Sequence, residues 1–314
     1  MAVEPTVTRR DRVVASGASR SVSRGRGRRR RARDGWLFVL PALSVYSLFV
    51  LLPLTRTIKY SLYRWDGVGP ATWVGLRNYR TVLADPDLLG SIFNSLRLVV
   101  FFSVIPVVLG LFAASVIHRV VRGRLGTLAR TVLFLPQVIP LVAAGIIWGW
   151  LLSLSGLVNQ TLTAIGLDGI TRAWLGDFDW ALPSVGMIGV WVLLGLCTVL
   201  LLTGMGKIDT SLYEAARIDG AGWFAELRAV TLPGLRYELG VCLTVTVISA
   251  LAAFDIVYVS TGGGPGNATA VPGIQIYVLA FLERQVGLAS ALAVIIVVLV
   301  LVAVIPLQRL TRQR

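Results

Sequence analysis

The stretch Glu214–Pro233, EAARIDGAGWFAELRAVTLP, is a long polar passage between two strongly apolar segments. A passage of this polarity cannot cross lipid hydrocarbon, so we expect it to be held at one face of a membrane. Its first half, from Thr210 or Ser211 to Asp219, predicts a short amphipathic helix with a hydroxyl cap before Glu214. The apolar side of this helix is predicted to contain Leu212, Ala215, Ala216 and Ile218.

Two glycines, Gly220 and Gly222, break this helix. A second short helix is predicted from Trp223 to Val230, ending where Pro233 can open the next helix at its first turn. Its apolar side is expected to hold Phe224, Leu227 and Val230. The stretch therefore predicts a helix, a glycine bend and a helix displayed on one membrane face, although a simple solvated loop between two spans has the same polarity.

The composition indicates that lipid is the main solvent of this chain. Over 314 residues the hydrophobic fraction is 55%, and the mean hydropathy is +0.76. The net charge of +14 does not indicate nucleic-acid binding, because the basic residues lie at the ends of apolar spans rather than among aromatic residues in a groove pattern. Cys197 and Cys242 each lie inside an apolar run, which predicts neither a disulfide framework nor a metal site.

Six apolar stretches are long enough to cross about 30 Å of hydrocarbon as helices. They are expected at Trp36–Thr57, Ile92–Ile117, Leu128–Leu152, Pro183–Met205, Tyr237–Val259 and Leu288–Leu307. Several of them contain proline, which predicts kinked helices. The run Val271–Leu282 is too short to span and predicts an interfacial or re-entrant helix. The predicted fold class is an all-α integral membrane protein with six transmembrane helices.

Residues 1–35 contain eleven arginines among Ser and Gly, without apolar periodicity. This composition predicts a disordered tail, with residues 36–314 forming the transmembrane domain. A signal peptide is an alternative, but the following apolar run is longer than an h-region and no small-residue cleavage site follows it. Attraction to anionic lipid headgroups is the simplest expectation for an uncleaved tail, and an RNA-binding arm is another.

The distribution of Lys and Arg predicts the orientation, because positive charge near span ends is retained in the cytoplasm. The N-terminus, residues 118–130, residues 207–236 and the C-terminal tail together hold 22 basic residues, and the alternate loops hold 7. Both termini and the Glu214–Pro233 loop are therefore expected to be cytoplasmic. The first external loop fits least well, because five of those 7 basic residues fall within residues 56–90.

The loop has a defined order: Glu-Ala-Ala, three residues, Gly, nine residues, an aliphatic residue, one residue and Leu-Pro. These positions are Glu214, Ala215, Ala216, Gly220, Val230, Leu232 and Pro233. The order resembles the EAA signature of binding-protein-dependent ABC importer permeases, and departs from it only at Val230, where Ile is commoner. The resemblance implies a type I importer fold, in which this loop docks into a cleft of a cytoplasmic ATPase.

Two further segments are similar to sugar permeases of the maltose and glycerol-3-phosphate type. They are WVGLRNY at Trp73–Tyr79, for which an interfacial aromatic anchor is an equal alternative, and Phe254-Asp255 followed by TGGGPGNAT at Thr261–Thr269. The glycine-rich turn is no phosphate cradle, because it has no GK[ST] ending and opens no nucleotide-binding unit. The companion subunits of that family often end in a glycine-rich stretch with a final Lys-Gly, whereas this sequence ends in QRLTRQR, so it looks like the maltose-F-type half of a heterodimeric pore.

The resemblance implies several partners in a bacterial inner membrane. They are a second permease subunit, two cytoplasmic ATP-binding subunits, an extracytoplasmic solute-binding protein and a solute that is a sugar or a related compound; no cofactor is implied. A self-sufficient secondary transporter is the alternative function, but a proton relay needs several intramembrane carboxylates or histidines, and only Asp255 qualifies here. An enzyme is not expected, since the one histidine, His118, has no clustered catalytic partners.

Polar groups at the depth of the spans are candidates for the solute pathway. They are Asn94, Arg97, Gln137, Trp191, Thr198, Thr244, Thr246, Ser249 and Asp255. Trp191, Thr246 and Ser249 are selected because ring stacking and hydroxyl hydrogen bonds suit a sugar, and Asp255 because a charged carboxylate is costly at span depth. Structural alternatives stay open: Asp255 can partner a helix end or an arginine, and Thr246 and Ser249 can bond to the preceding helical turn.

Overall fold

The structure is a computed structural model that describes residues 39–120 and 123–311, and its chain divides into two units, Met1–Leu54 and Thr55–Arg314. The predicted arginine-rich tail, residues 1–35, lies outside the described residues. The described part of the first unit is a helix with exposed apolar side chains, which contains a wide (π) turn at Ser47–Leu51. Helix α2 (Leu52–Tyr60) continues it into the second unit.

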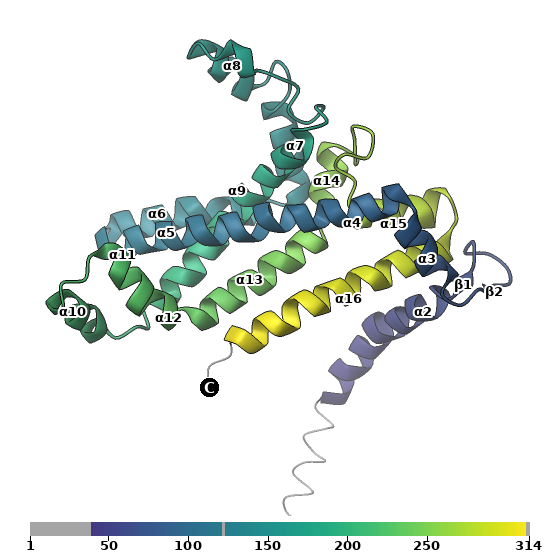
Figure 1. The fold of residues 1–314 in the computed structure, drawn as a ribbon, viewed down its shortest axis with the longest axis horizontal. Coiled ribbons are helices and arrows are strands. Elements are labelled where there is room, and N and C mark those ends of the chain that lie inside the picture. Colours follow the sequence, from purple (N-terminus) through teal and green to yellow (C-terminus); the bar gives the residue numbers. More distant parts are fainter. Residues whose placement is uncertain (1–38, 121–122, 312–314) are drawn as a thin grey trace, which may run out of the picture. The chain divides into compact units, whose positions relative to one another are not determined.

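The described part of the second unit is mostly helical (Figure 1). Its short hairpin pairs β1 (Tyr63–Arg64) with β2 (Thr72–Trp73) in antiparallel fashion. Its α-helices are α3 (Arg77–Ala84), α4 (Pro86–Val99), α5 (Ile105–Val120), α6 (Gly123–Val138), α7 (Leu141–Leu151), α8 (Leu157–Ala164), α9 (Ala181–Met205), α10 (Thr210–Ile218), α11 (Trp223–Glu226), α12 (Leu232–Gly234), α13 (Arg236–Leu251), α14 (Asp255–Ser260), α15 (Pro272–Tyr277) and α16 (Val286–Thr311). Further π turns lie at Val100–Val104, Leu227–Thr231 and Val278–Leu282, and a 3-10 turn lies at Asp168–Ile170.

The predicted all-α membrane fold is confirmed. Among the described residues, four helices are long and apolar enough to cross a membrane: Val39–Tyr60, Pro86–Arg119, Ala181–Met205 and Val286–Thr311. Two bent helix pairs raise the number to six if each pair is one span. The short apolar helix that the sequence predicts after the glycine-rich turn is also present, at Pro272–Leu282.

Two of the predicted spans are not the single helices that their sequences suggest. The stretch Leu128–Leu152 is bent by 97° between α6 and α7, because Pro140 lacks the N–H that would continue the helix. The stretch Tyr237–Val259 is interrupted after Leu251, and α14 begins only at Asp255. If these stretches lie within lipid, the irregular backbone at both breaks must be covered by protein or face a cavity, because hydrocarbon cannot satisfy its polar groups.

Wide turns precede three prolines inside otherwise continuous helices. Pro53, Pro106 and Pro233 each lie two residues after the end of a π turn. In each case the residue just before the proline donates its N–H to the carbonyl five residues earlier. A proline ring clashes with the carbonyl four residues before it, and the wider turn is a way to relieve this clash without breaking the helix.

Helix α9 is the centre of the second unit and packs against α5, α6 and α13. Two glycines allow the close approach. A Cβ at Gly189 would overlap the ring of Phe102, and a Cβ at Gly195 would overlap the backbone carbonyl of Leu133. Small residues at helix interfaces are typical of membrane bundles, where van der Waals packing holds helices together.

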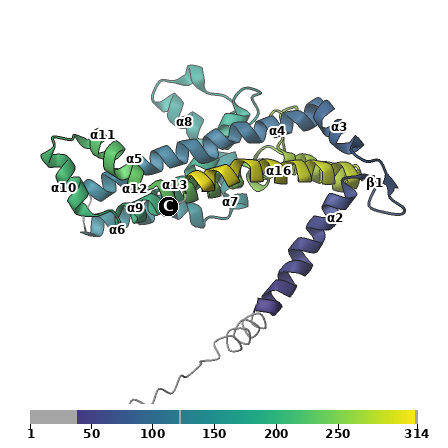
Figure 2. The same cartoon turned by 60° about the horizontal axis from the view of Figure 1, so that its bottom comes forward.

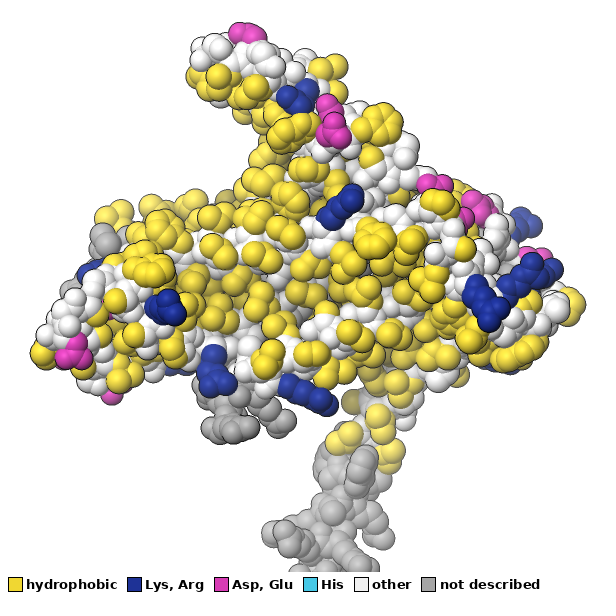
Figure 3. All heavy atoms as spheres, in the orientation of Figure 1, with side chains coloured by type: hydrophobic (Ala, Val, Ile, Leu, Met, Phe, Trp, Pro, Cys, Tyr) yellow, Lys and Arg dark blue, Asp and Glu magenta, His cyan; other side chains and the backbone are white. Residues whose placement is uncertain are grey.

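Long helices of the second unit lie side by side in both ribbon views, with α4 and α5 in line beside α13 and α16 (Figures 1 and 2). Hydrophobic side chains cover the middle of this face, whereas charged side chains gather toward its ends (Figure 3). This distribution suits a bundle surrounded by hydrocarbon, with its ends at the two water boundaries.

Candidate coupling loop and solute cavity

The loop after α9 begins with α10, the helix that contains Glu214, Ala215 and Ala216. Its cap differs from the predicted hydroxyl: the carboxylate of Asp209 accepts a hydrogen bond from the N–H of Ser211 at 2.9 Å. This bond lowers the pKa of Asp209 below its ordinary value. The prediction of the helix itself, with its end at the glycine bend, agrees with the structure.

Gly220 ends α10 in the left-handed region, with φ of +80°. A Cβ at this position would meet no atom within 4 Å, so the backbone conformation and not space requires glycine. The second helix is longer than predicted. It passes Val230, ends at Gly234, and is followed by α13 from Arg236, so Pro233 lies in the end of the loop's helix and does not open the next span.

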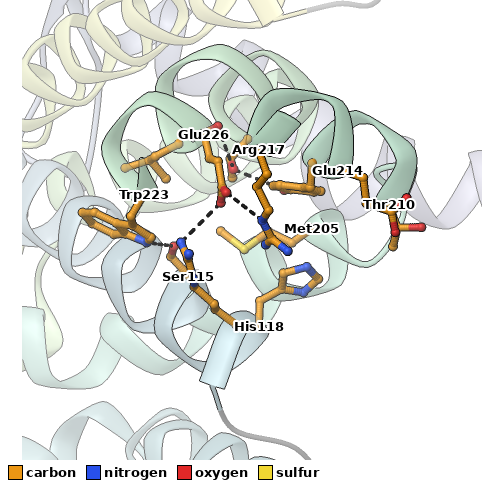
Figure 4. Close-up of a pocket in the computed structure, with 12 residues that line it drawn as sticks. Ser115, His118, Met205, Thr210, Glu214, Arg217, Trp223 and Glu226 are labelled. Carbon is orange, nitrogen blue, oxygen red and sulfur yellow. Dashed lines mark hydrogen bonds and ion pairs between the residues drawn. The ribbon is translucent and has the colours of Figure 1, made fainter. Parts of the chain in front are cut away.

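Glu226 holds the loop together and was not recognised in the sequence. Its side chain is 5% exposed, and its two carboxylate oxygens contact different helices. One oxygen accepts from Nε of Arg217 on α10 at 2.8 Å, and the other accepts from Arg119 at the end of α5 at 3.3 Å (Figure 4). The hydrogen bond to Glu226 raises the pKa of Arg217 above its ordinary value. A single carboxylate therefore links both loop helices to a membrane span.

Further contacts fix the same arrangement. The indole N–H of Trp223 donates to Ser115 on α5 at 3.1 Å, and the hydroxyls of Tyr213 and Thr231 lie 3.2 Å apart. Behind α10 these residues enclose a cavity of about 540 Å³ (Figure 4). Glu214 is exposed and is among the residues that line this cavity. Other exposed residues of the loop are Leu212, Ala215, Ile218 and Phe224, which do not line it.

The remaining signature positions lie in the second half of the loop. Val230 and Leu232 are half-buried, and Pro233 is exposed. The structure therefore brings the Glu-Ala-Ala segment and the glycine to an exposed knob, whereas the aliphatic positions connect that knob to the bundle.

A second cavity, of about 520 Å³, lies where the two helix breaks face each other. The α6–α7 bend contributes residues 137–141, and the interruption after α13 contributes residues 252–254. Gly189 and Leu193 of α9 form another wall, and Phe102 and Phe254 supply aromatic rings. Where broken helices meet at a cavity, some of their backbone and side-chain polar groups are available to bind a solute.

Three polar side chains line this cavity. Ser249, half-buried, donates its hydroxyl to the carbonyl of Val245 at 2.9 Å and retains acceptor capacity. Asp255 is exposed at the first residue of α14. Gln137 has a buried Oε1 atom with no hydrogen-bond partner among the described residues. The cavity therefore offers hydroxyl, carboxylate and amide groups beside aromatic rings.

The other two predicted pathway residues do not line this cavity. Thr246 is fully buried; its hydroxyl donates to the carbonyl of Cys242 at 2.8 Å and lies 2.7 Å from that of Ser103. Trp191 packs edge-on against Trp148, with their ring centroids 5.6 Å apart. The bond of Thr246 to Cys242, one turn earlier, is the structural alternative that the sequence left open for this residue.

The glycine-rich turn has a structural anchor rather than a phosphate. Asn94 of α4 donates its side-chain amide to the carbonyls of Ala268 and Ala270 at 3.1 and 3.0 Å. The hydroxyl of Thr269 donates to the carbonyl of Gly264 at 2.7 Å and lies as close to the hydroxyl of Thr261. Among the described residues, no group of three or more His, Cys, Asp or Glu side chains is placed to hold a metal ion.

Comparison with known proteins identifies the family. The family described as "Binding-protein-dependent transport system inner membrane component" matches residues 106–314. The probable ABC transporter permease protein YurN of Bacillus subtilis is 36% identical over 268 residues, which cover 85% of this chain and 91% of the relative. The trehalose/maltose transport system permease protein MalF of Thermococcus litoralis is 36% identical over 277 residues, 87% of this chain and 91% of the relative. The diacetylchitobiose uptake system permease protein NgcF of Streptomyces coelicolor is 33% identical over 95% of this chain and 87% of the relative.

Solved structures support the fold. A chain of a bacterial ABC transporter involved in the import of the acidic polysaccharide alginate superposes with a TM-score of 0.75 at 24% identity, covering 91% of this chain and 98% of the other. At this identity the likeness concerns the fold alone. Together with the family match over the helical bundle, it leads to one conclusion: this chain belongs to the inner membrane components of binding-protein-dependent transport systems, as a permease subunit of an ABC importer.

Proposed function

We propose that this permease moves a carbohydrate through the cavity between its two helix breaks. The cavity combines Gln137, Ser249 and Asp255 with the rings of Phe102 and Phe254. Sugars present hydroxyl groups for hydrogen bonds and apolar ring faces for aromatic contact, so this lining suits them. The names of two relatives, a trehalose/maltose permease and a diacetylchitobiose permease, support the same class. The unpartnered Gln137 oxygen is the observation that carries the proposal.

In this proposal the loop from Asp209 to Pro233 receives mechanical work from a separate ATPase. Its exposed apolar residues, Leu212, Ile218 and Phe224, fit a cleft on such a partner. Glu214, Ala215, Ala216 and Gly220 form the docking knob, and Val230, Leu232 and Pro233 connect it to the bundle. The ATPase dimer would hold the loop differently when it closes on nucleotide, which shifts the balance between inward-facing and outward-facing bundles.

The proposed assembly contains a second permease subunit, two ATP-binding subunits and an extracytoplasmic solute-binding protein. The loop and both termini face the cytoplasm in this assembly, in agreement with the excess of basic residues on that side. The runner-up is a self-sufficient secondary transporter. A proton relay would require several buried carboxylates or histidines, and Asp255 stands alone among the cavity residues.

Reconstitution in liposomes tests the proposal. The full chain alone should be inert under an imposed ion gradient, whereas the chain with its second permease, ATPase and solute-binding protein should accumulate labelled sugar when ATP is supplied. Accumulation by the chain alone, driven by an ion gradient, would contradict the ATP-driven mechanism. If the complete assembly hydrolyses ATP and transports a solute but does not accumulate labelled sugar, only the proposal that the solute is a carbohydrate would be contradicted.

A further inference from the structure

We propose that a pocket at the other end of the bundle binds the phosphate headgroup of a membrane lipid. The pocket has a volume of about 470 Å³ and lies between the β1–β2 hairpin, α3 and the start of α16. Three arginines line it, Arg64, Arg77 and Arg284. They come from three separate segments of the chain, so the fold and not a local charge run brings them together.

The walls of the pocket are fixed by the WVGLRNY segment. Asn78 donates its side-chain amide to the carbonyls of Ser61 and Tyr63 at 2.8 and 2.9 Å, and the hydroxyl of Tyr79 lies 2.7 Å from that of Ser61. On the other side, the N–H of Gly287 on α16 donates to the carbonyl of Trp65 at 3.1 Å. These bonds hold the hairpin between α3 and α16, so the pocket is preorganised.

The charge of the pocket is strongly positive. Among residues 39–120 and 123–311, none of the three arginines forms an ion pair. One acidic residue, Asp66, lines the pocket, and its carboxylate accepts from the N–H of Val68. Glu283 is adjacent and accepts from the side chain of Gln285 at 3.0 Å. Three guanidinium groups with unused donors therefore face one lining carboxylate, and such donors favour a phosphate.

The backbone of Arg284 gives a second, independent observation. Its φ is +56°, in the left-handed region after the last turn of the helix that ends at Leu282. Glycine is the usual residue at such a position, because a side chain there costs about 1 kcal/mol. An arginine at a position where glycine would be more stable indicates that its guanidinium is used.

The position of the pocket favours a lipid over another source of phosphate. Among the lining residues, Gln285 directly precedes the α16 span and Leu288 lies in its first turn, which places the pocket at headgroup depth. Large apolar side chains flank it: Trp73, Leu76, Phe281 and Leu282 are all more than 60% exposed. Figure 3 shows Lys and Arg side chains gathered at the end of the face where Figure 1 places α3, β1 and β2. A headgroup with its acyl chains matches this combination.

The inference also accounts for the basic residues that fit the orientation rule poorly. Arg64 and Arg77 lie in the first external loop of the predicted topology, where positive charge is disfavoured. Binding of a phosphate would explain why these two arginines lie in an external loop, although positive charge is disfavoured there. The proposal does not depend on the solute or on ATP.

The test uses the full detergent-purified chain and native mass spectrometry. Phosphatidylglycerol is titrated, and bound lipid is counted for the wild type, Arg77→Gln, Arg284→Gly and the control Arg80→Gln, which lies on the same helix outside the pocket. Loss of one lining arginine should weaken binding about fivefold. Arg80→Gln should bind as the wild type does. Arg284→Gly should weaken binding while its melting temperature stays equal or rises, which separates binding from misfolding.

Several results would overturn the proposal. Equal losses for Arg77→Gln and Arg80→Gln would show a diffuse charge effect. Unchanged binding in Arg284→Gly would exclude that residue and the strain argument with it. In a competition experiment, inorganic phosphate is added to the lipid-bound protein up to millimolar concentration. Displacement of the lipid by phosphate at the same concentration as the lipid would show that the pocket does not prefer a lipid headgroup. Retention of the lipid at that phosphate concentration supports the lipid headgroup as the ligand.

Discussion

A single buried carboxylate, that of Glu226, connects the exposed loop to the membrane bundle. Because it bonds to Arg217 and Arg119 at once, two charged hydrogen bonds link α10 to α5, and in the proposed coupling mechanism they would pass movement of α10 to α5. We expect Glu226→Gln, which keeps the shape but removes the charge, to raise the ATP hydrolysed per sugar transported about tenfold. The measurement is the ratio of ATPase to uptake rates in liposomes that contain the assembled transporter.

The matched control is Arg228→Gln, an exposed residue on the same helix. It should leave the ratio unchanged. If Glu226→Gln transports with wild-type efficiency, the carboxylate only stabilises the loop and does not transmit movement. Insertion into the membrane is checked in parallel, so that a misfolded variant is recognised.

Gln137 is the polar residue of the proposed solute cavity whose oxygen has no partner among the described residues. An unpaired buried acceptor is unfavourable unless a ligand satisfies it. Gln137→Leu should therefore raise the KM for uptake about tenfold, since one hydrogen bond to the sugar is lost while the side chain keeps its approximate volume.

Gln308→Leu, on α16 and outside this cavity, serves as the comparison and should leave KM unchanged. A drop in kcat without a change in KM for Gln137→Leu would place the residue in the transport movement rather than in sugar binding.

The sequence placed Gln137 among nine polar residues at span depth but gave no means to select it. Selection requires knowing that the chain turns at Pro140 and that the interruption after α13 faces the same space. Glu226 was missed for a related reason: its partners lie 9 and 107 residues away, and only the fold brings Arg119 near. In contrast, the signature residues of the loop were recognisable because their spacing is local.

Among the helices, proline was recognised as a source of irregularity, but its effect was not predicted in detail. Pro106 is accommodated by a wide turn inside one long helix, whereas Pro140 accompanies a bend of 97°. Both residues lack the same N–H, so the missing donor alone does not explain the difference. Hydropathy therefore predicted six spans, where the described residues hold four single helices and up to six spans with the bent pairs, and it gave the wrong course for two of them.

The bend between α10 and α11 depends on the left-handed backbone of Gly220. Gly220→Ala should destabilise the loop by about 1 kcal/mol, because a Cβ disfavours this conformation even though open space surrounds it. Hydrogen exchange of the α10 amides in the reconstituted transporter should increase, and uptake should fall with it.

Gly222→Ala is a matched control two residues away. Its φ is −77°, and a Cβ there also meets nothing within 4 Å, so the cost should be smaller. Equal effects of the two substitutions would show that flexibility of the bend, and not the left-handed geometry of one residue, matters.

For the molecule as a whole, the orientation in the membrane is predicted from the basic residues: the termini and loops assigned to the cytoplasm hold 22 of them, and the alternate loops hold 7. The helical bundle alone does not determine this orientation. The chain offers a direct way to measure the orientation, because both native cysteines are buried. Cys197 and Cys242 are 0% and 1% exposed and should not react with a bulky maleimide. Single cysteines introduced at exposed loops then report the side of the membrane on which each loop lies.

We expect Asp168→Cys, in the exposed loop after α8, to react with a membrane-impermeant maleimide in right-side-out vesicles. Arg228→Cys, in the proposed cytoplasmic loop, should react only after the vesicles are opened, and the pattern should reverse in inside-out vesicles. The wild-type chain should stay unlabelled in both, which controls for the native thiols. Labelling of Arg228→Cys in sealed right-side-out vesicles would place the loop on the external side, where no cytoplasmic ATPase can reach it, and would contradict the coupling proposal directly.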